Sequence, residues 1–142
     1  MRTIKFRGKS IDGELPNGEE LYGNFVYGNL LLHKNGVYRI LVPIDGGFEN
    51  YKVAPHTIGQ FTGLHDKNGN EIYEGDILRW YENNLLYVVT FESGMFYASI
   101  KECNEGMIGG FPLHQLTEYD YGKCEIVGNI HDNPELLKGG ER

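Results

Sequence analysis

Acidic side chains gather near the middle of the sequence, in the part best equipped to do chemistry. Glu71, Glu74 and Asp76 follow closely on His65 and Asp66. A pair of carboxylates can carry out acid–base catalysis or bind a cation. An Asp beside a turn also accepts hydrogen bonds from nearby backbone N–H groups. We favour this structural interpretation, in which the two aspartates order two successive turns.

The other residues that could form a catalytic or metal site are not spaced as such a site requires. No two of the five histidines have a metal-ligand spacing, and neither cysteine belongs to a Cys-x-x-Cys pair. The glycines of residues 106–110 are followed by Phe111, which does not fit a phosphate-binding loop. We therefore predict no metal, no cofactor and no enzymatic activity. The residues weighed are His33, His56, His65, His114, His131, Cys103 and Cys124.

Four aromatic residues are the best candidates for contact with a partner. Tyr73, Trp80, Tyr81 and Phe96 lie in or beside predicted strands. Together they could form a platform on which a base or a peptide stacks. The alternative, which we favour, is a packed core with the tryptophan at its rim.

Charge argues against nucleic acid as the partner. The net charge is −7 and the pI is about 5.2, whereas affinity for nucleic acid comes mainly from Lys and Arg on phosphates. The one basic cluster is Arg2, Lys5, Arg7 and Lys9. On a strand, the last three would project from one side, and we interpret that side as a solvated face rather than a phosphate site.

Composition and pattern predict a mainly β protein. The chain has ten Tyr, seven Phe and 20 Gly in 142 residues; aromatic residues favour strands, and glycines supply turns. Strands are predicted over residues 2–8, 21–28, 29–33, 37–42, 48–53, 76–81, 85–91, 95–100 and 123–130.

Turn signals join these strands. Asn35-Gly36 and Asn68-Gly69 predict type I′ hairpins, because both residues tolerate a positive φ. Residues 101–110 are polar and rich in glycine, and no strand is predicted there. Near the end of the chain, Asn133 and Pro134 predict a capped helical turn.

Three segments carry a family resemblance. Residues 57–78 contain Thr-Ile-Gly-Gln-Phe-Thr-Gly-Leu, then Asp-Lys-Asn-Gly, then Ile-Tyr-Glu-Gly-Asp-Ile. Residues 4–9 and 126–137 flank them in the same order. With these segments the chain resembles the YopX family of small phage and prophage proteins. The resemblance implies a phage-encoded, intracellular, mainly β protein, and it offers no catalytic residue to transfer.

Strand count and resemblance together predict the architecture. Residues 1–56 should form an antiparallel meander, because their connections are too short for parallel crossovers. Residues 57–142 should hold the signature hairpin and a small SH3-like barrel, which would hide its own edges. The two parts could also form one compact unit.

Three functions are open at this point. The first is a phage accessory protein in the cytoplasm of its bacterial host that acts through protein–protein contacts, with itself and with a host or phage protein. The second is a nucleic-acid-binding module that uses the C-terminal barrel. The third is an acidic decoy of a host DNA-binding protein. We favour the first. A membrane location is not expected, since no apolar run approaches about 18 residues.

Overall fold

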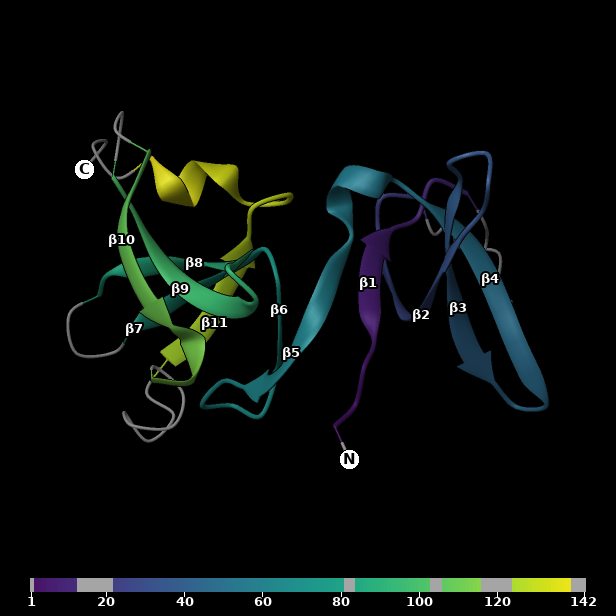
Figure 1. Cartoon of the computed structure of the whole chain (residues 1–142), viewed down its shortest axis with the longest axis horizontal. Coiled ribbons are helices and arrows are strands. Elements are labelled where there is room, and N and C mark those ends of the chain that lie inside the picture. The colour runs from purple at the N-terminus through teal and green to yellow at the C-terminus, as the bar shows by residue number, and fades with distance from the viewer. Residues whose placement is uncertain (1, 13–21, 81–83, 103–105, 116–123, 139–142) are drawn as a thin grey trace. The chain divides into compact units, whose positions relative to one another are not determined.

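The computed structural model describes residues 2–12, 22–80, 84–102, 106–115 and 124–138 of the chain. Tyr81, a candidate for partner contact, and Cys103, which was weighed as a metal or catalytic residue, lie outside these ranges. The chain divides into two compact units, Met1–Phe61 and Thr62–Arg142. Both are built from antiparallel strands (Figure 1), so the predicted mainly β class is confirmed. Among the described residues, no helix has the length and apolar character that a membrane crossing needs.

The first unit is an antiparallel meander of four strands (Figure 1). They are β1 (Phe6–Lys9), β2 (Phe25–Leu32), β3 (Tyr38–Ile44) and β4 (Gly47–Val53), and each pairs with the next. The two strands predicted over residues 21–28 and 29–33 are thus one strand.

Gly28 explains why that strand looks broken in the sequence. Residues 25–28 of β2 pair with β1, and residues 29–32 pair with β3. A Cβ atom at Gly28 would lie 2.0 Å from the carbonyl oxygen of Leu41. Only glycine permits backbones to approach so closely, so Gly28 marks a bend rather than an end.

The meander curls until its first and last strands meet at one end. Ser10 forms an antiparallel bridge with Val53. Beside it, the N–H of Ile11 donates to Lys52 O (2.9 Å) and the N–H of Ala54 donates to Lys9 O (3.0 Å). The curl encloses a core of Val26, Ile40, Tyr51 and Val53.

Strand β5 (Gly59–His65) follows the short helix η1 (Pro55–Thr57). Its residues Gly59 and Gln60 pair with β1, and its later residues enter the second unit. The elements that follow are β6 (Glu71–Tyr73), β7 (Asp76–Trp80), β8 (Leu86–Glu92), β9 (Met95–Glu102), β10 (Gly106–Pro112), β11 (Cys124–Asn129) and the helix η3 (Pro134–Leu137). Five of these strands form a second sheet, in the order β10-β9-β8-β7-β11.

The closed SH3-like barrel expected for this part of the chain is not formed. Strands β10 and β11 are the two ends of the second sheet. The outer edge of β11 is covered instead by the turn between β5 and β6, where the N–H of Lys67 donates to Cys124 O (2.9 Å). Strand β10 was also missed, because pairing with β9 overrides the weak strand propensity of its glycines.

The two Asn-Gly turns differ from the predicted type I′ geometry. A type I′ turn needs a positive φ at both central residues. Here Gly36 and Gly69 have φ of 83° and 82°, while neither preceding Asn has a positive φ. Both loops match the three-residue hairpin that ends in a left-handed glycine. Among the described residues, Ser93-Gly94 is the pair with a positive φ at both positions.

Candidate functional site

The three described members of the predicted aromatic platform, Tyr73, Trp80 and Phe96, are buried or half-buried in the second unit. Tyr73 is only 2% exposed, and its hydroxyl donates to Glu71 Oε1 (3.0 Å). Trp80 and Phe96 are half-buried and pack against the core formed by Ile72, Leu78, Tyr87, Val89, Ala98, Leu113 and Cys124. Tyr73 therefore offers no ring face to a ligand, and a binding role for the other two stays a prediction.

Two aspartates of the acidic cluster, Asp66 and Asp76, accept hydrogen bonds from nearby backbone N–H groups. Asp66 Oδ1 accepts from the N–H groups of Asn68 and Asn70 (both 2.9 Å). Asp76 Oδ2 accepts from the N–H of Tyr73 (2.7 Å). Both aspartates are buried, which agrees with the structural interpretation. Within the described ranges, no three His, Cys, Asp or Glu side chains are grouped as metal ligands.

The basic cluster is not a solvated face. Arg7 is 5% exposed, and its Cζ lies 4.2 Å from the ring centroid of Phe25. Lys9 Nζ lies at the same distance from that ring, and Lys5 Nζ is 5.5 Å from the Phe61 ring. Aromatic rings on the neighbouring strands thus cover the cations that the alternation pattern predicted to be exposed to solvent.

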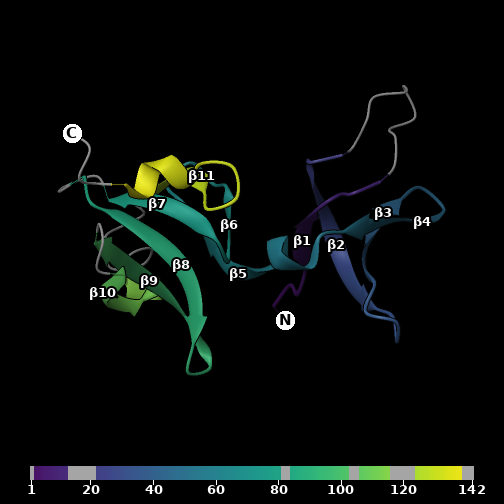
Figure 2. The same ribbon diagram turned by 90° about the horizontal axis from the view of Figure 1, so that it is seen from above.

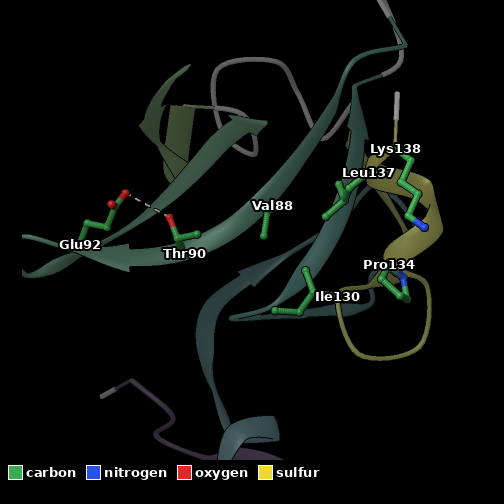
Figure 3. A pocket seen from close by; sticks show the side chains of 7 residues that line it. All are labelled: Val88, Thr90, Glu92, Ile130, Pro134, Leu137 and Lys138. Atoms are coloured by element: carbon green, nitrogen blue, oxygen red, sulfur yellow. Dashed lines mark hydrogen bonds between the residues drawn. The ribbon is translucent and has the colours of Figure 1, made fainter. Parts of the chain in front are cut away.

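A groove in the second unit is a better candidate site than these clusters (Figure 3). It has a volume of about 480 Å³. One wall is β8, whose alternate residues face the same way, and the other is the C-terminal segment with η3. The lining residues are Val88, Thr90, Glu92, Ile130, Pro134, Leu137 and Lys138.

A network of short-range hydrogen bonds builds the second wall. Asn129 Oδ1 accepts from the N–H groups of His131 (3.0 Å) and Asp132 (2.9 Å). Asn133 was expected to cap η3, but its side chain makes no capping bond to that helix. Its Oδ1 accepts instead from the N–H of Asn129 (3.2 Å). This turn brings Ile130 and η3 against β8.

The groove is apolar at its centre and polar at its ends. The side chains of Val88, Ile130 and Leu137 surround the hollow (Figure 3). At one end Thr90 Oγ1 lies 3.3 Å from Glu92 Oε2 and 2.9 Å from Ser99 Oγ. Lys138 lies at the other end. A groove of this kind could bind a polypeptide segment that has apolar residues at its centre and polar residues on either side.

Sequence reasoning missed the groove although one signal was present. The alternation of Val88, Thr90 and Glu92 shows that β8 has a mixed face. Nothing local indicates that Ile130 and Leu137, which come far later in the chain, lie over that face.

Comparison with known proteins gives the family. The family described as "YopX protein" matches residues 29–138. Protein EF1440 from Enterococcus faecalis is similar in structure, with a TM-score of 0.55 and 23% identity over 96% of this chain and 99% of that one.

A second solved structure has the same fold. It is YopX from Bacillus subtilis, with a TM-score of 0.52 and 14% identity over 96% of this chain and 97% of that one. None of the curated proteins matches. The family match covers most of the chain and includes two of the three signature segments, residues 57–78 and 126–137, so the predicted family is confirmed: the protein belongs to the YopX family.

Proposed function

We propose that this protein acts by binding other polypeptides, as a phage or prophage accessory protein in its bacterial host, and catalyses no reaction of its own. Its first partner in this proposal is a second copy of itself. The groove of the second unit carries the proposal, because it has an apolar centre and a polar rim, as protein–protein interfaces do.

The same unit also offers a projection that could fill such a groove. Phe91 and Met95, beside the tip of the β8–β9 hairpin, are 50% and 42% exposed. That hairpin is long and curved (Figure 2). Phe91 packs edge-on against Phe96, with centroids 5.0 Å apart, which holds the ring in place. A two-fold pair of chains would cover each groove with the partner's hairpin tip.

Light scattering coupled to size exclusion tests this proposal over a range of protein concentrations. The wild type should form a dimer. Ile130→Glu places a charge in the groove at a side chain that is 37% exposed, and it should give a monomer. Phe91→Glu tests the hairpin tip in the same way. Leu32→Glu is the matched control, because that apolar side chain is 60% exposed in the first unit.

The possible outcomes distinguish self-association through the groove from other behaviour. A dimer that Leu32→Glu preserves and the other two variants abolish supports self-association through the groove. A wild type that stays monomeric at all concentrations contradicts it. Equal effects of all three variants would assign the contact to general surface hydrophobicity. Far-UV circular dichroism verifies that each variant is folded.

A further inference from the structure

The negative charge of the chain belongs to the second unit alone. Residues 1–61 contain seven Lys and Arg against six Asp and Glu, whereas residues 62–142 contain six against fourteen. The net charge of −7 therefore does not describe the first unit, which is close to neutral. The net charge of the whole chain therefore does not exclude an anionic partner for the first unit.

Two cations of the first unit, Arg39 and Lys52, lie on the outer side of its meander. Strand pairing sets Leu31 opposite Arg39, and Arg39 opposite Lys52. Directly opposed residues project from the same side of a sheet. Glu49 is the single carboxylate within β1, β2, β3 and β4; it lies on the inner side, where the hydroxyl of Tyr51 donates to it.

The pairing of Arg39 with Lys52 is electrostatically unfavourable by itself. Like charges directly opposite one another destabilise a sheet. The Nη1 of Arg39 donates to Asn50 Oδ1 (3.0 Å), so its neighbour on this side is a neutral amide rather than a carboxylate. An anion between the two cations would relieve their repulsion.

Exposed aromatic and amide groups share this outer side. Tyr27 is 44% exposed and lies opposite Arg7. Phe48 is 59% exposed and lies two residues before Asn50 on β4. Asn29 is exposed as well. It pairs with Leu41 on β3, and Leu41 pairs with Asn50 on β4, so the two amides lie on the same side of the sheet. Rings stack on bases, amides hydrogen-bond to base edges, and cations contact phosphates.

We infer that the outer side of the first unit binds single-stranded nucleic acid, with Arg39 and Lys52 on phosphates and with Tyr27 and Phe48 on bases. Charge complementarity selects an anionic partner, and the exposed rings favour unpaired bases over an acidic peptide. This site lies in the other unit from the one that the sequence suggested for nucleic acid.

Fluorescence anisotropy of the full chain with labelled oligothymidylate and oligouridylate tests the inference. Binding should weaken with salt, with a logarithmic slope of about 0.7 for each phosphate contact on a single strand. Arg39→Glu and Lys52→Glu should each weaken binding about tenfold and lower that slope. Tyr27→Ala and Phe48→Ala should each weaken it at least about fivefold, with little change in slope.

Two further variants control for charge. Lys34→Glu changes the net charge by the same amount at an exposed turn position, and it should leave affinity almost unchanged. Asp12 Oδ1 accepts from the N–H of Lys52 (3.1 Å); Asp12→Asn keeps an acceptor but removes a carboxylate beside the site, and it should tighten binding.

Three results would overturn the inference. The first is no binding at about 50 mM salt, where electrostatic contacts are strong. A second is an equal loss for Lys34→Glu and Arg39→Glu, which would mean that only net charge matters. The third is equal competition by polyglutamate and by unlabelled oligonucleotide, which would assign the surface to acidic polypeptides.

Discussion

Two hairpins in this protein share the tripeptide Lys-Asn-Gly but differ in what they hold together. In the first unit, the N–H of Gly36 donates to His33 O (3.0 Å), and the N–H of His33 donates to Val37 O (2.9 Å). In the second unit, the corresponding bonds join Gly69 to Asp66 (3.0 Å) and Asp66 to Asn70 (2.9 Å). The local geometry of the two turns is therefore the same.

The residue that begins each turn makes the difference. His33 is exposed, whereas Asp66 is 5% exposed. Besides its two bonds within the turn, Asp66 accepts from the N–H of Ile126 in β11 through Oδ2 (3.0 Å). One carboxylate thus ties the hairpin to a strand 60 residues later. A turn motif thus specifies a bend, while its first side chain decides whether the bend supports the tertiary structure.

Removing that carboxylate should have the largest effect. Asp66→Ala leaves three backbone N–H groups without their acceptor. Those of the exposed Asn68 and Asn70 can turn to water, whereas that of the half-buried Ile126 is less accessible, and an unsatisfied buried donor costs about 1–3 kcal/mol. We expect a loss of about 2 kcal/mol or more, against less than about 0.5 kcal/mol for His33→Ala at an exposed site. Urea denaturation followed by Trp80 fluorescence reports on the second unit, since Trp80 is the one tryptophan in the chain.

Asp66→Asn sharpens this test. The amide keeps an oxygen for the turn but presents its NH₂ group toward the N–H of Ile126, so its effect should be intermediate. Equal stability of the Asp66→Ala and His33→Ala variants would contradict the assigned role of Asp66.

The two glycines should respond alike, with a smaller loss. Gly36 and Gly69 both have a left-handed φ, and a Cβ atom would meet nothing within 4 Å at either position. Alanine at each should therefore cost only the strain of that conformation, about 1–2 kcal/mol. Thermal unfolding by circular dichroism measures both. A loss at Gly69 several times that at Gly36 would show that the turns are not equivalent.

The smallest expected effect is on the pH dependence of stability, and it involves the lysine in one of the two turns. Lys67 Nζ lies 3.8 Å from Glu125 Oε2, and Arg79 also pairs with Glu125. The hydrogen bond from Arg79, assisted by the charge of Lys67, lowers the pKa of Glu125 below its ordinary value of 4.5. A carboxylate with a lowered pKa in the folded state stabilises the fold above its unfolded pKa, and that contribution is lost as pH falls below 4.5.

Stability measured against pH checks this expectation. Glu125→Gln should flatten part of the loss below about pH 4.5, and Lys67→Ala should do so more weakly. Lys34→Ala is the control, because it sits at the same place in the other hairpin. If the stability of Glu125→Gln and of the wild type fell identically with pH, Glu125 would not contribute to the acid sensitivity of the fold.

The mainly β class, most of the strands, the position of both hairpins and the family could be predicted from the amino-acid sequence. These features depend on residues that are neighbours in the chain, through alternating polarity, turn glycines and Asn-Gly pairs. The bend at Gly28, strand β10, the open second sheet, the groove and the hydrogen bond from Ile126 to Asp66 could not be predicted in this way. Each of these features depends on contacts between residues far apart in the chain. A local sequence pattern does not specify which distant backbone group or side chain a residue will contact.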